Sequence, residues 1–233
     1  MSKRQALGQH FLKSDKIARS IVDFADIKRT DVVLEVGTGL GILTPLLCKR
    51  AKAVISVEKD PILYDKARTR FAEIKNLVLE CGDAFGMDVG FDVLVSNLPY
   101  SESRNAMEWL VQRRFSHAVV MLQKEFAQKL LSKGGRDRKA VSVLAGYCLQ
   151  MEALMDVGKD SFRPAPRVDS TVMFLKQEKT ISREMIAAVN RLFSYRRKTV
   201  GNIARQFGLA INSDKRLEDL PDSEIIEIAK EIT

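Results

Sequence analysis

The residue types with the clearest chemical meaning begin in a glycine-rich segment, Leu34–Gly41. It follows a run of β-branched residues and precedes the apolar segment Ile42–Cys48. Glycines let the backbone turn tightly and approach a ligand, and the start of a following helix offers free N–H groups. Gly37 and Gly39 follow the spacing G-x-G-x-G, whereas the dinucleotide fingerprint needs a further glycine where this chain has Ile42. The segment therefore predicts a nucleotide-like ligand other than NAD or FAD.

Two acidic residues follow the next two β-type runs. Glu58 ends the run Ile55–Val57, where a carboxylate can accept hydrogen bonds from both hydroxyls of a ribose. A solvated charge at the end of a strand is the alternative interpretation of Glu58. Asp83 follows the third run, where it could reach an adenine amine, although Gly82-Asp83 is also a common turn.

The segment Asn97-Leu98-Pro99-Tyr100 ends the fourth β-type run and favours methylation of an exocyclic amine. The lone pair of such an amine is delocalised into the purine ring, and two acceptors on its protons favour the pyramidal, nucleophilic form. The side-chain oxygen of Asn97 and a nearby backbone carbonyl can supply these acceptors, and Tyr100 offers a flat face for an extruded base. A proline turn capped by asparagine is the alternative interpretation.

The elements that position these residues alternate between β-type runs and helical patterns, which is typical of βαβ units around a parallel sheet. We predict an α/β fold with a doubly wound, seven-stranded, mostly parallel sheet that ends in a hairpin. The predicted strands are Val32–Val36, Ala53–Val57, Leu77–Glu80, Phe91–Ser96, Ala118–Leu122, Ala153–Val157 and Thr171–Leu175, and Val141–Gln150 is helix-like. From Ile181 onward the pattern is helical only, with Gly208 as a helix stop and a last helix at Glu224–Glu231.

Charge divides the chain unevenly. The net charge is +8 and the isoelectric point about 9.4, which favours an acidic partner such as nucleic acid or anionic lipid. The segment Lys176–Arg216 holds 10 basic and 3 acidic residues, so it carries nearly all of the excess. We predict a catalytic domain at residues 1–177 and a small helical domain at 178–233. Basic clusters at Arg113–Arg114, Lys133–Lys139 (with Arg136 and Arg138) and Arg196–Lys198 could contact phosphates, or each could be a solvated face.

Composition excludes several other classes of protein. Hydrophobic residues make up 45% and charged residues 29% of the 233 residues, as in a globular protein rather than a disordered chain. The three cysteines form no C-x-x-C pair, so no metal site is predicted, and a reduced, cytoplasmic setting is expected. No stretch approaches eighteen uninterrupted apolar residues, so we expect no membrane segment. His117 is expected to be a packed or surface histidine rather than a catalyst.

The ordered set of motifs resembles the KsgA-type small-subunit ribosomal RNA adenine dimethyltransferases. Gly8–Leu12 resembles the N-terminal motif of that family, and the glycine loop, Glu58, Gly82-Asp83 and Asn97–Tyr100 follow in family order. The motifs Phe162–Ser170 and Phe193–Thr199 complete the match, which runs nearly end to end. His10 stands where bacterial members usually have asparagine, and this resembles the archaeal and eukaryotic branch.

The resemblance implies a Rossmann-like fold, S-adenosylmethionine as methyl donor and no metal. It implies transfer of two methyl groups to each of two adjacent adenosines in a helix-end loop near the 3′ end of small-subunit ribosomal RNA, during subunit biogenesis. The implied cofactor-binding residues are His10, Leu12, Gly37, Gly39, Glu58, Asp83 and Asn97. The implied catalytic residues are Asn97, Leu98, Pro99, Tyr100 and Phe162, with Tyr100 and Phe162 stacking on the adenine.

The implied partners are small-subunit ribosomal RNA and the immature small subunit, with no membrane, and we expect a monomer. Two alternatives remain. A large-subunit RNA dimethylase of the macrolide-resistance type shares the first motifs, although the Phe193–Thr199 segment disfavours it. A ribosome-assembly factor would act by binding rather than by methylation, and both roles can coexist in one protein.

Overall fold

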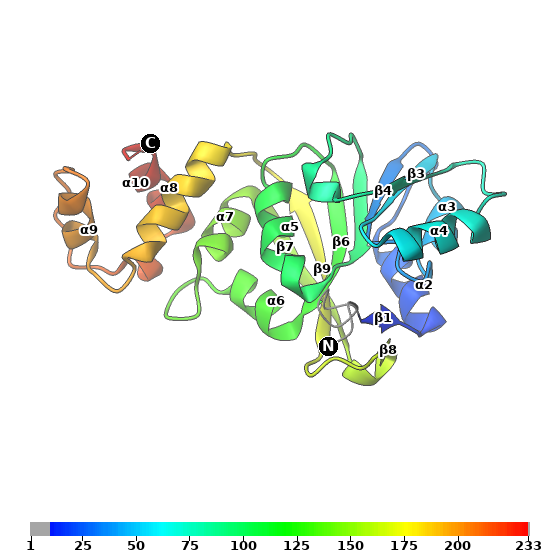
Figure 1. The fold of residues 1–233 in the computed structure, drawn as a ribbon. Coiled ribbons are helices and arrows are strands. Elements are labelled where there is room, and N and C mark those ends of the chain that lie inside the picture. Colours follow the sequence, from blue (N-terminus) through cyan, green and yellow to red (C-terminus); the bar gives the residue numbers. More distant parts are fainter. Residues whose placement is uncertain (1–9, 233) are drawn as a thin grey trace. The chain divides into compact units, whose positions relative to one another are not determined.

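The computed structural model describes residues 10–232 of the chain (Figure 1). These residues form two compact units, one of residues 10–106, 114–124 and 151–176, and one of residues 107–113, 125–150 and 177–232. Residues 107–113 and 125–150 thus pack with the helices that follow residue 177. The division into functional domains at 177/178 stays a prediction. No helix within residues 10–232 is long and apolar enough to cross a membrane.

A seven-stranded sheet forms the first unit, in the order β4-β3-β2-β5-β6-β9-β7. Its strands are β2 (Val32–Val36), β3 (Ala53–Glu58), β4 (Leu77–Cys81), β5 (Val93–Asn97), β6 (His117–Gln123), β7 (Leu149–Val157) and β9 (Ser170–Gln177). Strands β2 to β6 pair in parallel, and β9 runs antiparallel to β6. The predicted mostly parallel sheet is confirmed, and each predicted strand lies within or overlaps an observed one.

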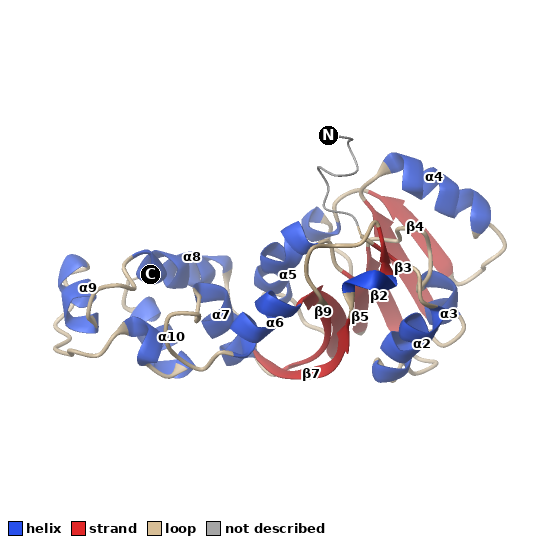
Figure 2. Ribbon diagram, turned by 90° about the horizontal axis from the view of Figure 1, so that it is seen from below, coloured by secondary structure: helices blue, strands red, loops and turns tan. Residues whose placement is uncertain are grey.

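Helices cover both faces of this sheet. Figure 2 shows α4 (Pro61–Arg70) on one face and α2 (Asp15–Phe24) and α3 (Thr44–Cys48) on the other. The side chain of Ser14 accepts a hydrogen bond from the Ile17 N–H and so caps α2. Buried aliphatic side chains of α2 and α3 pack on the apolar residues of the central strands. The carboxyl ends of β2 to β5 therefore meet at one edge of a rigid sheet, where ligands bind in open α/β folds.

A second, two-stranded sheet joins β1 (Phe11–Leu12) to β8 (Phe162–Arg163). The strands run antiparallel, with Leu12 opposite Phe162. The two prolines that follow, Pro164 and Pro166, predict an irregular loop rather than a strand for this segment. The observed strand has only two residues and ends just before the first proline, which is too short for an alternating pattern to appear in the sequence.

The second unit is helical. Its helices are α6 (Lys124–Leu131), α7 (Ala140–Cys148), α8 (Arg183–Ser194), α9 (Val200–Gln206) and α10 (Asp222–Lys230), and α5 (Ser103–Leu110) belongs half to each unit. Helices α7, α8 and α10 pack against one another through buried aliphatic side chains. Gly208 has a positive φ of 73° just after α9, which confirms the predicted helix stop.

One basic residue of the second unit is buried, against expectation. Arg138 is only 1% exposed, and its guanidinium donates to the carbonyl oxygens of Glu218 and Leu220 and forms an ion pair with Asp222. Arg138 is therefore neither a phosphate contact nor part of a solvated face, so both interpretations of the Lys133–Lys139 cluster are wrong for this residue. A count of charges along the chain cannot separate a buried arginine from exposed ones.

Candidate active site

The glycine loop turns the chain sharply between β2 and α3. The Gly37 N–H donates to the Val57 carbonyl oxygen at 2.8 Å, which ties the loop to the end of β3. Gly39 and Gly41 have φ values of +57° and +71°, which side chains rarely adopt. A Cβ atom at Gly41 would lie 2.4 Å from the ring of Phe71. Both backbone conformation and space therefore require glycine here.

A buried polar network lies beneath this loop. One carboxylate oxygen of Glu35 accepts hydrogen bonds from Ser56 Oγ at 2.6 Å and from Thr44 Oγ1 at 2.8 Å. Thr38, in the loop itself, lies 2.6 Å from the Ser56 hydroxyl. Burial raises the pKa of Glu35 to about 7, although the two hydrogen bonds oppose the rise. The network fixes the loop to β2, β3 and the start of α3.

Glu58 holds the other side of the loop. Its side chain is 3% exposed, and it accepts hydrogen bonds from the Gly39 and Asp60 N–H groups, each at 2.8 Å. An ionised carboxylate has about four lone pairs, so two remain for further donors. Glu58 lines the hollow above the glycine loop and also a second hollow beside it. Glu58 could therefore bind a ribose that lies between the two hollows.

The second hollow contains Asp83. One oxygen of Asp83 accepts the Phe85 N–H at 3.1 Å, and the other lies 2.9 Å from Lys59 Nζ. The hydrogen bond from Lys59 is the main cause that lowers the pKa of Asp83 below its usual range. Glu102 lines the same hollow. Asp83 therefore stays an ionised acceptor near neutral pH.

The segment Asn97–Tyr100 forms one wall of the first hollow. The amide nitrogen of Asn97 donates to the His10 carbonyl oxygen at 3.2 Å, so its side-chain oxygen is the group left to accept from a ligand. The Tyr100 hydroxyl lies 2.6 Å from Ser170 Oγ, and burial raises the pKa of this phenol. Leu98 is buried, and Pro99 lines both hollows.

The N-terminal residues His10, Phe11 and Leu12 line the same hollow beside Asn97–Tyr100. The His10 ring centroid lies 5.4 Å from that of Tyr100. The Nδ1 atom of His10 donates to the Pro164 carbonyl oxygen at 2.9 Å. The rest of the predicted N-terminal motif, Gly8 and Gln9, lies outside the described residues.

Phe162 alone among the predicted site residues is placed elsewhere. It is 2% exposed, belongs to the hydrophobic core and lines neither hollow. Its backbone pairs with Leu12, so it supports a wall of the first hollow from behind. The structure therefore brings together His10, Leu12, Gly37, Gly39, Glu58, Asp83 and Asn97–Tyr100, but not the ring of Phe162.

Sequence reasoning missed three groups that shape the site. Thr38 and Ser56 belong to the network under the glycine loop, and Lys59 lines the second hollow. A serine within the apolar run Val54–Val57 was a usable signal, because a buried hydroxyl needs a polar partner. Nothing in the sequence indicated that Lys59 would reach Asp83, which lies 24 residues further on.

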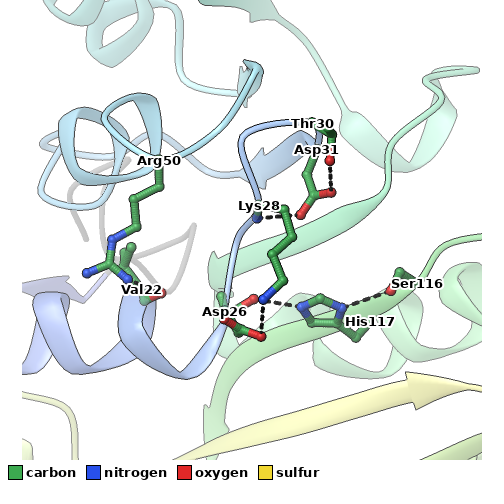
Figure 3. Close-up of polar contacts among 9 residues, drawn as sticks. Val22, Asp26, Lys28, Thr30, Asp31, Arg50, Ser116 and His117 are labelled. Atoms are coloured by element: carbon green, nitrogen blue, oxygen red, sulfur yellow. Dashed lines mark hydrogen bonds and ion pairs between the residues drawn. The ribbon is translucent and has the colours of Figure 1, made fainter.

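His117 lies apart from this site. Its Nε2 atom donates to the Ala25 carbonyl oxygen at 2.7 Å, and its ring stacks on Phe174 with centroids 5.4 Å apart. Figure 3 shows Ser116 at the other ring nitrogen, with Asp26 and Lys28 nearby. His117 thus joins the end of α2 to β6, as expected for a packed histidine. Among residues 10–232, no group of three or more His, Cys, Asp or Glu side chains is placed to hold a metal ion.

The two hollows suit a nucleoside that carries a positive charge. They meet at Gly37, Glu58 and Pro99, so one extended molecule can occupy both. Their charged lining residues are Glu35, Glu58, Asp83, Glu102 and the single cation Lys59. Carboxylates accept hydrogen bonds from ribose hydroxyls and an adenine amine and attract a sulfonium ion, whereas they repel the phosphates of a dinucleotide. The carboxylates that line the two hollows therefore fit S-adenosylmethionine.

The fold and this site define a Rossmann-like methyltransferase that uses S-adenosylmethionine as its methyl donor. Residues 1–233 match the family described as "Ribosomal RNA adenine dimethylase". The chain belongs to this family and is an RNA adenine dimethyltransferase.

Single proteins of known name are also similar to this chain in sequence and in structure. The chain is 36% identical to a ribosomal RNA small subunit methyltransferase A of Thermotoga neapolitana, over 97% of this chain and 90% of that one. It is 34% identical to a probable enzyme of the same name from the archaeon Pyrococcus abyssi, over 93% and 82% of the two chains. A dimethyladenosine transferase from Plasmodium falciparum superposes with a TM-score of 0.83 and 27% identity, over 94% and 96%. The 23S rRNA methyltransferase ErmE shares the fold, with a TM-score of 0.69 at 22% identity over 95% and 99%.

Proposed function

We propose that this enzyme dimethylates the exocyclic amines of two adjacent adenosines in a helix-end loop near the 3′ end of small-subunit ribosomal RNA, during ribosomal subunit biogenesis. The names of its curated relatives support the small subunit as the source of the RNA. The observation that carries the amine chemistry is the orientation of Asn97, whose amide nitrogen is bonded to His10 and whose oxygen is left for the substrate.

Asn97 and the backbone beside it hold the target amine. The Asn97 side-chain oxygen and the Leu98 or Pro99 carbonyl oxygen accept its two hydrogens, which returns the nitrogen lone pair from the ring to the amine. Tyr100, held through Ser170, offers its ring for stacking on the extruded adenine. S-adenosylmethionine supplies an electrophilic methyl group when bound. No general base is required, because the methylated amine is cationic and loses its proton to water.

The cofactor is held by residues on both sides of the glycine loop. Gly37 and Gly39 let the backbone approach it, and the two remaining lone pairs of Glu58 accept the ribose hydroxyls. Asp83 accepts the adenine amine. His10, Leu12 and Asn97 enclose the amino-acid end in the first hollow. Phe162 contributes through Leu12 rather than by direct contact.

The helical domain at residues 178–233 binds RNA. Two of its exposed cations lie on aromatic rings: the Arg191 guanidinium is 4.7 Å from the Phe207 ring centroid, and Lys198 Nζ is 5.3 Å from that of Tyr195. Cations interleaved with aromatic rings favour contacts to phosphates and unstacked bases. We place the enzyme in the cytoplasm as a monomer that acts on the immature small subunit.

Methyl transfer to defined RNA tests this function. The full-length protein is incubated with methyl-labelled S-adenosylmethionine and unmethylated small subunits, with large subunits in parallel, and the labelled nucleotides are mapped. Dimethyladenosine at two adjacent positions of the small-subunit RNA is the expected result. Label in the large-subunit RNA alone would identify the enzyme as a large-subunit dimethylase instead, and no label in either would contradict the proposal.

Replacement of Asn97 separates methylation from binding. Asn97→Ala removes one acceptor for the target amine but leaves the exposed cations of the helical domain in place. We expect methylation to fall by at least about 100-fold, with binding of unmethylated subunits, measured by co-sedimentation, unchanged within twofold. Such a result would favour an additional role as an assembly factor. Loss of subunit binding by the folded variant would argue against that role.

A further inference from the structure

An ion pair lines the second hollow at the carboxyl edge of the sheet. Lys59 directly follows the last residue of β3. Asp83 follows the neighbouring strand β4, with one residue between them. Lys59 Nζ lies 2.9 Å from one oxygen of Asp83, and both side chains line the hollow. The two side chains are about half exposed, so the pair sits at the rim rather than in the core.

Two donors fix the plane of the Asp83 carboxylate. The Phe85 N–H binds one oxygen at 3.1 Å, and Lys59 binds the other. Each oxygen keeps one lone pair, so the carboxylate still offers acceptors to a ligand in the hollow. With Phe85 alone, the carboxylate could turn about its bond to Cβ, because one oxygen would have no donor from the protein.

Lys59 remains a cation while it does this. The hydrogen bond to Asp83 is the main cause that raises the pKa of Lys59, and the charge of Glu102 on the same hollow adds to the rise. Lys59 therefore stays charged near neutral pH and keeps its donors for Asp83. Its action is geometric rather than a proton switch.

We propose that Lys59 is a positioning residue that makes the second hollow specific for a 6-aminopurine. It holds Asp83 so that a carboxylate oxygen faces the position of the purine 6-substituent. An amine there donates to the oxygen, whereas a 6-oxo group would place two acceptors face to face. This inference rests on the proposed function, in which the nucleoside end of S-adenosylmethionine occupies this hollow.

Calorimetry with the cofactor product and its 6-oxo analogue tests the inference. S-adenosylhomocysteine carries the 6-amino group and S-inosylhomocysteine carries a 6-oxo group in its place. The quantity to compare is the preference ratio, the dissociation constant of the inosyl compound divided by that of the adenosyl compound. The full-length wild type is compared with Lys59→Met, Lys59→Arg, Asp83→Asn and Lys66→Met. Lys66 is an exposed lysine of α4 that lines neither hollow, so its variant is the matched control.

We expect Lys59→Met to lower the preference ratio about fivefold, the upper range for a half-exposed ion pair. The loss should fall on the adenosyl compound, and the inosyl compound should bind no more weakly than to wild type. Lys59→Arg should restore the ratio to within twofold of wild type, and Lys66→Met should not change it. Asp83→Asn should lower the ratio about tenfold or more, because it replaces a charged acceptor.

Three results would overturn the inference. A Lys59→Met ratio within twofold of wild type, with a reduced ratio in Asp83→Asn, would leave Lys59 as a surface ion pair. Equal weakening of both compounds by Lys59→Met would assign it a general structural role. A wild-type ratio in Asp83→Asn would show that the purine does not contact Asp83, so the assignment of this hollow to the nucleoside would fail as well.

Discussion

Glu35 is a carboxyl group in a place that disfavours its charge. It is 1% exposed, and its hydrogen-bond donors are hydroxyl groups rather than cations. Burial raises its pKa from 4.5 to about 7. Glu35 is bonded to Ser56, which contacts Thr38 of the glycine loop. A change in the protonation of Glu35 near neutral pH therefore changes the hydrogen bonds that hold this loop.

The stability of the protein should therefore depend on pH through Glu35. Because the folded pKa is raised above the unfolded value, the stabilising effect of the protonated form is complete below pH 4.5 and is lost as pH rises through 7. Glu35→Gln is neutral at every pH. Relative to wild type, its free energy of unfolding should rise by about 3 kcal/mol between pH 4.5 and pH 8.

Urea unfolding of both proteins across this pH range measures the difference. All other titrating groups are shared, so they cancel when the two curves are subtracted. Parallel curves would mean that Glu35 ionises in the folded protein as readily as in the unfolded one.

Single residues show what the sequence could and could not predict of the site. Gly37, Glu58, Asp83 and Asn97 were predicted, because each follows a strand at the same sheet edge. Their partners were not: the bond from Asn97 to the His10 carbonyl joins residues 87 positions apart. Such pairs depend on how distant segments meet, and local patterns carry no information about that.

At the level of elements, β1 and β8 form the wall that local patterns could not predict. They are two residues each, far shorter than the strands of the main sheet. The sheet itself was predicted because most of its strands are runs rich in β-branched and aliphatic residues that alternate with helical patterns. The family resemblance implied that Phe162 stacks on the adenine, but its position opposite Leu12 buries the ring in the core.

Phe162→Leu should accordingly affect stability more than catalysis. A smaller side chain in the core should lower the free energy of unfolding by about 1–2 kcal/mol. The single-turnover methylation rate of the folded variant should stay within twofold of wild type. Tyr100→Leu provides the comparison, because Tyr100 lines the first hollow and its loss should slow methylation.

Urea unfolding and single-turnover assays on both variants, at a temperature where both are folded, decide between these roles. Equal slowing of methylation by the two substitutions would mean that the Phe162 ring reaches the substrate.

For the whole molecule, binding of nucleic acid depends on where the charged side chains lie more than on the net charge. The net charge of +8 suggested a nucleic-acid partner, and the basic segment after residue 176 was evident by counting. The burial of Arg138 was not evident from the sequence, because its partners Glu218, Leu220 and Asp222 lie 80 to 84 residues further on, before and at the start of α10. Arg138 holds the second unit together and is not available to phosphates.

Arg138→Met should destabilise the protein by about 3 kcal/mol, since it leaves Asp222 without its cation and two carbonyl oxygens without a donor. Arg136→Met, at an exposed neighbour, should change the free energy of unfolding by less than about 0.5 kcal/mol. Denaturant unfolding of the two variants measures the contrast. A loss below about 1 kcal/mol in Arg138→Met would show that the buried pair merely offsets its own desolvation.

The pairing of residues 10–12 with residues 162–164 also sets when the enzyme becomes functional during its own synthesis. The walls of the first hollow come from the N-terminal residues and from Asn97–Tyr100, and Ser170 holds Tyr100. At roughly 5–20 residues per second, the ribosome needs about 10–30 s to extend the chain from residue 10 to residue 170. Until then the glycine loop is present but open on one side. A nascent chain of this enzyme therefore cannot complete the walls of its cofactor site before residue 170 has emerged.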